Sequence, residues 1–382
     1  MPPDILIQNV SSQCIPNLVA AKTLLPQKII WVYTAEFGDV LNRLRAQTQF
    51  ITADQENWRV DARDVESMHQ SLLERFESLN PNSKVYFHLT GGTKSMALQG
   101  LYNLGSFRRN KKAEVVGFVM DPRSQCFDVI YPTPKNNALA CEALTLDEML
   151  AVHGNQWDDH HAHVELADCA ADYNLWESMR TLTRVLKKEF SLNDLRALHE
   201  RPPRGKCRHF GSAKPVPASL KKIFRVLEGN GRIRNLSWPN ANEFRYEQTG
   251  EDIIKLINGA WLEHWLGAVL HQSNIGWRGA RVSAKYLEGR GGSQELDFLG
   301  ATAANRLVYW SCKTDIKLTN DKLFEVDALR DGIAGADFHV AGILHTAHMT
   351  DVMQAKARRM GLQTVNAFSP DAAEQLVKFS GG

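Results

Sequence analysis

Glu-Leu-Asp-Phe-Leu-Gly at residues 295–300 and Leu-Val-Tyr-Trp-Ser-Cys-Lys-Thr at residues 307–314 are the two stretches that decide the fold of the C-terminal half. Both are apolar and contain aromatic residues, which favours strands. Residues 301–306 between them are short enough for a hairpin connection, so we expect the two strands to pair in antiparallel fashion.

Side chains alternate across a strand, so Glu295 and Asp297 share one face, and Ser311 and Lys313 share one face of the next strand. A carboxylate beside an ammonium group suits phosphodiester hydrolysis. The acid can hold a divalent metal ion that activates water, while the lysine offsets developing charge. The alternative is a surface hairpin with a solvated ion pair, which is a common feature of strands.

A helix is predicted upstream, over residues 258–270. Its apolar residues recur at helical spacing and form one core-facing stripe, made of Trp261, Leu262, Trp265 and Val269. Glu263 lies off the centre of this stripe, so it could reach the same site from the helix.

This order of a helical Glu, a strand Asp and a strand that ends Cys-Lys-Thr resembles the PD-(D/E)xK restriction-endonuclease-like fold. It is similar, more closely, to the C-terminal nuclease domain of the CRISPR ancillary nucleases that carry an N-terminal CARF sensor. The resemblance implies a metal-dependent endonuclease in which Asp297 and Glu263 bind Mn²⁺ or Mg²⁺. It also implies that Lys313 serves the water or the transition state, and Glu295 is a further candidate for the metal shell.

Ser311 departs from that family, in which the second strand usually ends Glu-Cys-Lys-Thr. A hydroxyl is a poor substitute for a carboxylate, because hard divalent cations prefer charged oxygen ligands. Three explanations stay open: another acid, Glu263 or Glu295, replaces the missing ligand, or the site binds metal weakly, or it is inactive. We favour replacement and keep Ser311 among the candidate catalytic residues.

The N-terminal half alternates strands and helices. Strands are predicted at residues 5–10, 29–33, 85–89, 115–120 and 126–131, and helices at 36–47 and 62–79 and around Ala97 to Leu104. This alternation is typical of a mostly parallel sheet of Rossmann type, in which ligands sit at the carboxyl ends of the strands.

Leu-Thr-Gly-Gly-Thr-Lys-Ser-Met at residues 89–96 lies at such a position, between a strand and a helix. Consecutive glycines let the backbone approach a ligand, and a helix start offers free N–H groups to phosphate. The stretch is neither a Walker A loop nor a GxGxxG fingerprint, which disfavours nucleotide hydrolysis and dinucleotide binding. By itself it could also be a plain turn.

The Thr-Gly-Gly-Thr-Lys string resembles the signature of the CARF domain, which senses cyclic oligoadenylates, and residues 11–17 resemble that family's other ligand-facing loop. The resemblance implies a homodimer with the ligand on its two-fold axis, most plausibly cyclic tetra-adenylate as activator. The residues expected to contact the ligand are Gln13, Asn17, Thr34, Thr90, Gly91, Gly92, Thr93 and Lys94.

The bulk composition of the 382 residues is that of a globular protein: 43% are hydrophobic and 23% charged. The net charge of +2 means that nucleic-acid binding must rest on a local basic patch. Six scattered cysteines, the lack of a secretory signal and the lack of a membrane-spanning run predict a cytoplasmic protein that makes no membrane contact.

The middle of the chain is predicted to be mainly helical, with a basic linker at 201–209 and a helix followed by a hairpin, a possible winged-helix fragment, at 220–246. Three histidines at 160, 161 and 163 lack the spacing of a zinc helix and favour a solvated loop. We therefore divide the chain into a CARF sensor at 1–140, a helical linker at 141–250 and a nuclease domain at 251–382.

The sequence thus predicts a cyclic-oligoadenylate-activated, metal-dependent nuclease of type III CRISPR defence that acts on DNA and on single-stranded nucleic acid, including RNA. Two alternatives stay open. One is a ligand-controlled nucleic-acid-binding regulator without cleavage, which the Ser311 departure and the hairpin favour. The other is a ring nuclease, in which the sensor itself degrades its activator.

Overall fold

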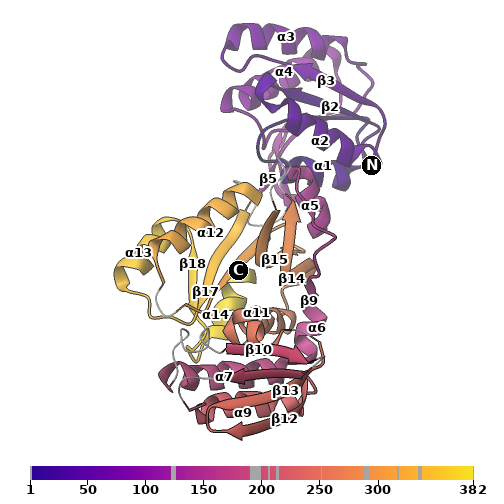
Figure 1. Ribbon diagram of the computed structural model, residues 1–382. Helices are drawn as coiled ribbons and strands as arrows, with labels where there is room; N and C mark the ends of the chain where they lie inside the picture. Colours follow the sequence, from indigo (N-terminus) through magenta and orange to yellow (C-terminus); the bar gives the residue numbers. More distant parts are fainter. Residues whose placement is uncertain are drawn as a thin grey trace.

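Three parts of the chain follow one another along the long axis of the molecule (Figure 1). The structure is a computed structural model that describes residues 2–121, 126–189, 199–204, 207–211, 215–250, 252–287, 293–315, 318–333 and 338–381. The N-terminal unit lies at one end, a second large sheet lies in the centre, and a small sheet with its helices lies at the other end.

The N-terminal unit is built on a seven-stranded sheet of order β3-β2-β1-β4-β5-β6-β7. Its strands are β1 (Ile5–Asn9), β2 (Lys28–Tyr33), β3 (Gln55–Arg59), β4 (Val85–His88), β5 (Val115–Asp121), β6 (Cys126–Tyr131) and β7 (Lys135–Ala140). The first five pair in parallel, whereas β6 and β7 are antiparallel. The expected Rossmann-like arrangement is therefore confirmed.

Helices cover both faces of this sheet because its central strands are apolar on both faces, and β1 is buried along its whole length. The helical segments are α1 (Ile15–Leu24), the short 3₁₀ turn η1 (Ala35–Phe37), α2 (Gly38–Thr48), α3 (Val65–Ser78) and α4 (Lys94–Lys111). The strand order reverses between β1 and β4, and the two predicted ligand loops follow these strands. This is the position where α/β sheets bind ligands.

The central sheet has the order β18-β17-β16-β15-β14-β8, and β9 also pairs with β14. Its C-terminal strands are β14 (Trp277–Leu287), β15 (Ser293–Thr302), β16 (Leu307–Lys313), β17 (Phe338–His345) and β18 (Gln363–Asn366). Around them lie α10 (Ile253–Lys255), the π-helical turn η2 (Leu256–Ala260), α11 (Trp261–His271), α12 (Asn320–Ile333), α13 (Asp351–Arg359) and α14 (Ala372–Gly381). Phe298 of β15 lies opposite Trp310 of β16, so the predicted antiparallel hairpin is confirmed.

The middle segment is mixed, and the expectation of a mainly helical linker is corrected. It contains α5 (Leu146–His153), β8 (Gln156–Trp157), β9 (Val164–Glu165), α6 (Leu166–Ala171), α7 (Tyr173–Glu189), β10 (His199–Arg204), β11 (Cys207–Gly211), α9 (Ala218–Gly229), β12 (Ile233–Asn240) and β13 (Glu243–Gln248). The last four strands form an antiparallel sheet of order β10-β11-β13-β12. The predicted helix and hairpin are α9 and β12–β13.

The expected basic linker at 201–209 is also corrected, because its described residues belong to the hairpin β10–β11, in which Arg201 pairs with His209; residues 205 and 206 lie outside the described part. Pro202 and Pro203 misled the prediction. Proline is tolerated in an edge strand, where its missing N–H faces away from the ladder, and β10 is the edge of this sheet.

The middle and C-terminal segments share one hydrophobic core, in which Trp176 of α7, Phe244 of β13 and Trp265 of α11 belong to the same buried cluster. The strands β8 and β9 also extend the central sheet. The middle segment is therefore packed against the C-terminal unit. The domain limits at 140 and 250 stay predictions. In the described residues, no helix combines the length and apolarity that crossing a bilayer requires.

Candidate functional sites

The glycine turn after β4 packs directly against the end of β1. A Cβ atom on Gly91 would lie 2.5 Å from the Asn9 carbonyl oxygen, and one on Gly92, which has φ +81°, would lie 2.9 Å from the Asn9 Cβ. Only glycine fits this approach. The structure therefore brings the two predicted ligand loops together at one point of the sheet.

Two threonines hold this turn in shape. Thr90 Oγ1 accepts a hydrogen bond of 2.8 Å from the Met120 N–H of β5. Thr93 Oγ1 accepts one of 3.2 Å from the Met96 N–H, so Thr93 is the N-cap of α4. Lys94 follows at the exposed start of that helix, and Gln13 of the other loop is half-buried. Of the predicted residues, Thr93 and Lys94 are thus exposed and Gln13 and Thr90 half-buried, and the hydroxyls of Thr90 and Thr93 accept a backbone hydrogen bond while each keeps a proton to donate.

The expected ligand contact of Asn17 is corrected. Asn17 is fully buried, and its amide donates hydrogen bonds to Gln8 Oε1 at 3.3 Å and to the Asn9 carbonyl at 3.0 Å. Residue 17 belongs to the first turn of α1, and this turn directs its side chain under β1 instead of toward the loop surface. Asn17 therefore positions the end of β1.

A buried polar cluster beneath the loops escaped the prediction. Gln8 and Asn9 at the end of β1 and His88 at the end of β4 are fully buried together with Asn17. Within the described residues, several of their polar atoms have no hydrogen-bond partner: Gln8 Nε2, both amide atoms of Asn9, Asn17 Oδ1 and His88 Nε2. Burial lowers the pKa of His88 to about 3, so its imidazole is neutral. The signal in the sequence was a polar residue at the end of each of two apolar strands.

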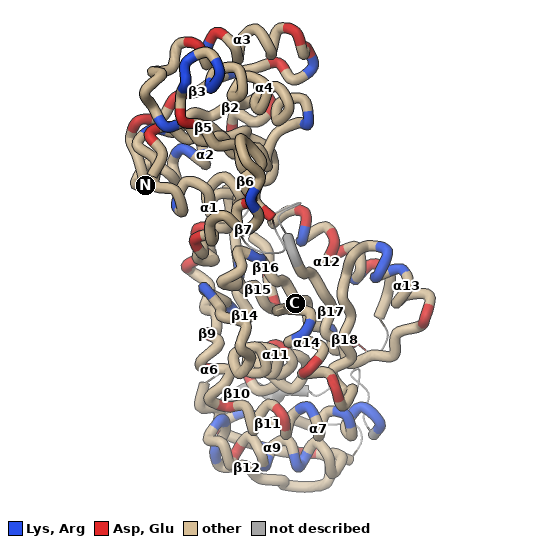
Figure 2. The backbone as a smooth tube through the Cα atoms, turned by 180° about the vertical axis from the view of Figure 1, so that it is seen from behind, with Lys and Arg blue, Asp and Glu red and all other residues tan. Residues whose placement is uncertain are grey.

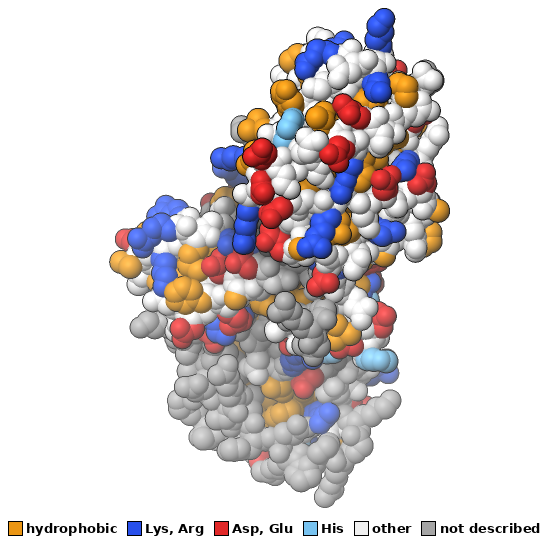
Figure 3. All heavy atoms as spheres, turned by 90° about the horizontal axis from the view of Figure 1, so that it is seen from above, with side chains coloured by type: hydrophobic (Ala, Val, Ile, Leu, Met, Phe, Trp, Pro, Cys, Tyr) orange, Lys and Arg blue, Asp and Glu red, His pale blue; other side chains and the backbone are white. Residues whose placement is uncertain are grey.

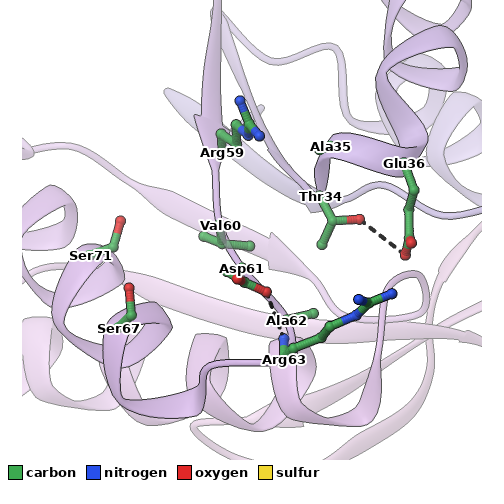
Figure 4. A pocket seen from close by; sticks show the side chains of 10 residues that line it. All are labelled: Thr34, Ala35, Glu36, Arg59, Val60, Asp61, Ala62, Arg63, Ser67 and Ser71. Carbon is green, nitrogen blue, oxygen red and sulfur yellow. Dashed lines mark hydrogen bonds between the residues drawn. The ribbon is translucent and has the colours of Figure 1, made fainter.

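Thr34 lies in a different hollow from the glycine turn. It lines a cavity of about 630 Å³ at the carboxyl ends of β2 and β3, and its hydroxyl donates to Glu36 at 3.4 Å (Figure 4). The other polar side chains around this cavity are Arg59, Asp61, Arg63, Ser67 and Ser71. Its lining includes none of the other predicted ligand residues, so Thr34 stands apart from them.

The second site is centred on Asp297 of β15, which is held from the neighbouring strand. Its Oδ2 accepts a hydrogen bond of 3.0 Å from the Ser311 hydroxyl and one of 2.6 Å from the Cys312 N–H. Glu263 of α11 is fixed in the same way, because the Ser283 hydroxyl of β14 donates to it. Both carboxylates remain partly accessible to solvent.

The two carboxyl groups lie near enough for the charge of Asp297 to act on Glu263. Burial raises the pKa of Glu263 to about 8, and repulsion from Asp297 and Glu295 adds to the effect. Burial also raises the pKa of Asp297, against the opposing pull of Lys313 and of its two hydrogen bonds. Glu295 lies on the same face of β15 as Asp297 but is exposed, so it is at the rim of the site.

Lys313 completes the group. Burial alone would lower its pKa, but the carboxylates of Asp297 and Glu325 outweigh burial and raise it, so the amine stays charged. Its Nζ donates to Glu325 Oε1 at 3.0 Å, and Lys322 donates to the other oxygen at 2.8 Å. Glu325 of α12 therefore aims Lys313, a role that the sequence did not reveal. Glu263, Asp297 and Lys313 thus lie near one another, since the charge of Asp297 acts on Glu263 and that of Lys313 acts on Asp297, and their catalytic roles stay a prediction.

These residues suit a divalent cation, although among the described residues no three His, Cys, Asp or Glu side chains lie close enough to hold a metal ion by themselves. Glu263 and Asp297 are half-buried, and the negative charge of Asp297 disfavours that of Glu263, so a cation bound near both would relieve the repulsion. Magnesium is commonly bound by only one or two carboxylates, with water and substrate phosphate as the other ligands. Ser311 donates its hydrogen bond to Asp297, so it orients a carboxylate and does not replace one.

Comparisons with known proteins found a family match for the N-terminal unit and similar solved structures for nearly the whole chain. Residues 5–149 match the family model of the Card1 CARF domain. Can2 from Sulfobacillus thermosulfidooxidans, solved in complex with cyclic tetra-adenylate, is similar in structure with a TM-score of 0.73 and 17% identity, covering 99% of this chain and 100% of that one.

A second solved structure, protein VC1899 from Vibrio cholerae, has a TM-score of 0.73 and 16% identity, with 98% and 97% of the two chains covered. No curated protein matches the sequence. At such identities the likeness establishes a shared fold. The family match therefore identifies residues 5–149 as a CARF domain, and the rest of the chain is placed by its fold alone.

Proposed function

We propose that this protein is a cyclic-oligoadenylate sensor that controls a metal-dependent nuclease in type III CRISPR defence. The CARF match over residues 5–149 and the complex of the similar Can2 with cyclic tetra-adenylate support the sensing half. The observation that carries the nuclease half is the convergence of Glu263, Asp297 and Lys313.

In the sensor, the ligand is an anionic ring that lies at the carboxyl ends of β1 and β4. Lys94 is the cation at the start of α4, and the N–H groups of this helix start point toward the same place. A second copy of the chain supplies the other half of the pocket, because a ring of identical nucleotides matches two-fold symmetry.

In the nuclease, Glu263 and Asp297 would hold a divalent ion, Mn²⁺ or Mg²⁺, and Glu295 at the rim would accept a hydrogen bond from a water molecule. A bound ion would supply polarisation of the scissile phosphate and a lower pKa for water. Lys313 stays protonated beside Asp297 and stabilises the negative charge that develops on the phosphate. Ser311 and the Cys312 N–H keep Asp297 in one orientation.

The helix α5 connects the two sites. On the sensor side, Lys22 of α1 pairs with Glu148 at 2.6 Å, and Arg43 of α2 donates to the Val152 carbonyl at 3.0 Å. Just beyond α5, the Asn155 amide donates to the Ile333 carbonyl at the end of α12, at 2.7 Å. Since α12 carries Glu325, a ligand-dependent shift of α5 reaches the residue that aims Lys313.

The test is supercoiled plasmid incubated with Mn²⁺, with and without cyclic tetra-adenylate. We expect nicking only when both are present, and Asp297→Ala should abolish nicking while it leaves ligand affinity intact. Nicking that persists in Asp297→Ala would remove this assignment of the catalytic centre.

A regulator without cleavage is the second candidate, and Ser311 favours it, because a hydroxyl stands where the similar nucleases usually have a third acid. In that case the plasmid would be shifted in a gel upon ligand addition and would remain supercoiled at every metal concentration.

A further inference from the structure

The small module at the end opposite the sensor is the basic part of the chain. Residues 199–250, here called the basic module, contain 11 Lys and Arg against four Asp and Glu, whereas the rest of the chain contains 34 against 39. The module is thus strongly cationic on a protein that is otherwise slightly acidic. At the sensor end, by contrast, acidic and basic side chains are interspersed (Figure 3).

In the basic module, the helix α9 packs on the sheet that contains the hairpin β12–β13. Phe224 of α9 packs on Phe244 of β13, with 4.6 Å between ring centroids. The hairpin β12–β13 follows α9 directly and is tied back to it, since the Leu236 N–H donates to Glu228 at 2.9 Å and Lys221 lies 5.4 Å from the centroid of the Trp238 ring.

Two cations on α9 face away from this packing. Lys222 and Arg225 are exposed and one turn apart, while Ile223 and Phe224 beside them are buried. In the described part of the chain, neither of these two cations has an ion-pair partner. Arg234 and Arg245 are further exposed cations, on the hairpin strands. Exposed lysine and arginine side chains that form no ion pair within the protein are available to bind the phosphate groups of a nucleic-acid backbone.

The module is held at a fixed position relative to the carboxylate site. The helix α7 packs on both α9 and α11, as Figure 2 also shows from behind. From α7, Glu177 accepts a hydrogen bond of 2.9 Å from the Trp265 indole, and Trp265 is two residues beyond Glu263. Lys187 of α7 donates to the Thr314 carbonyl at 2.5 Å, next to Lys313. A strand bound on the module therefore lies at a set distance from the site that would cut it.

We propose that the basic module, through the outward face of α9, binds the phosphate backbone of the nucleic acid that the carboxylate site cleaves. The link to cleavage rests on the function proposed above, but binding itself does not. The contact is electrostatic and reads no sequence, because lysine and arginine on a backbone position the strand without reading the bases.

The experiment measures binding in the full-length Asp297→Ala protein with cyclic tetra-adenylate, so that the probe is not cut. The probes are fluorescein-labelled duplex DNA, single-stranded DNA and single-stranded RNA, followed by anisotropy between about 50 and 200 mM KCl. The variant is Lys222→Glu with Arg225→Glu. The matched control is Arg358→Glu with Arg359→Glu on α13, two exposed cations with the same change of charge.

We expect the α9 variant to bind at least about tenfold more weakly, with the slope of log Kd against log salt reduced by about 1 to 2, while the control changes by less than about twofold. Comparison of the three probes identifies which backbone the module prefers. The proposal would be overturned if the α9 and α13 double variants lost affinity for the probes equally, or if the α9 double variant lost none. If the wild-type protein binds nucleic acid through α9 but never nicks plasmid, the binding proposal stands and the proposed nuclease function is wrong.

Discussion

The sensor and the C-terminal unit each bury a cluster of polar side chains, but the two clusters differ in kind. Below the glycine turn, Gln8, Asn9, Asn17 and His88 are all neutral and leave several atoms without partners in the described residues. Between α11 and β15, the clustered groups are titratable: Glu263, Asp297 and Lys313.

The difference shows what each site needs to be complete. An unpaired buried amide costs about 1–3 kcal/mol and is satisfied by hydrogen bonds. Facing carboxylates instead change their pKa values, and a cation satisfies them. The neutral cluster therefore calls for hydrogen bonds, whereas the charged cluster fits the metal ion proposed above.

The largest effect is expected at the charged cluster. Glu263→Gln keeps the shape but removes a proposed metal ligand, so the nicking rate should fall by more than about 100-fold.

The raised pKa of Glu263 means that its contribution to stability is complete below its ordinary value of 4.5 and is lost as the pH rises to about 8. The variant should lack this loss in metal-free thermal melts between pH 5 and 8, recorded beside the wild type. A rate within a few-fold of wild type would contradict the charged cluster's role.

Gly91→Ala tests the sensor alone. A Cβ atom 2.5 Å from the Asn9 carbonyl must displace the turn, which costs about 1–3 kcal/mol, so the affinity for cyclic tetra-adenylate should fall by about tenfold or more. Calorimetric titration measures it. The control is Gly38→Ala in the same unit, where a Cβ atom would meet nothing within 4 Å. Equal affinities in both variants would remove the turn from the ligand site.

Asn155→Ala tests the connection between the clusters. Loss of the hydrogen bond to Ile333 should leave ligand affinity and metal binding nearly unchanged but reduce activation, the ratio of nicking with and without ligand, by about fivefold or more. The plasmid assay at saturating ligand measures this ratio. An unchanged ratio would mean that α5 does not transmit the signal through α12.

Ser311→Glu tests whether the charged cluster binds a cation. A third carboxylate beside Asp297 should lower the melting temperature by several degrees in the presence of a chelator, because like charges are enclosed together, and Mn²⁺ should restore it. Ser311→Ala is the control, since it removes the hydroxyl without adding charge. Destabilisation that Mn²⁺ does not reverse would argue against a cation at this place.

The smallest effect is expected from His88→Gln. Because burial holds the pKa of His88 at about 3, against about 6.5 in the unfolded chain, its contribution to stability is complete above pH 6.5 and is lost as the pH falls toward 3. The variant should show a shallower loss of sensor stability between pH 6.5 and 4 in thermal melts. His160→Gln, at an exposed position, is the control and should follow the wild type.

Local patterns in the sequence predicted the strands β15 and β16, their antiparallel pairing and the mostly parallel N-terminal sheet. They did so because strand alternation and helical spacing fix which face a residue occupies, and because the glycine turn and the hairpin are short-range features. The same patterns failed for the middle segment, where prolines in the edge strand β10 resembled a linker.

Tertiary packing alone decided the rest. Asn17 donates its amide to Gln8 of β1, and Glu325 of α12 accepts a hydrogen bond from Lys313 of β16. The strands β8 and β9 join a sheet whose other strands lie more than a hundred residues later. No local pattern encodes such contacts, since they depend on how separate elements meet. The sequence by itself therefore determined which groups could do chemistry, and the three-dimensional structure decided which neighbours hold, aim and connect them.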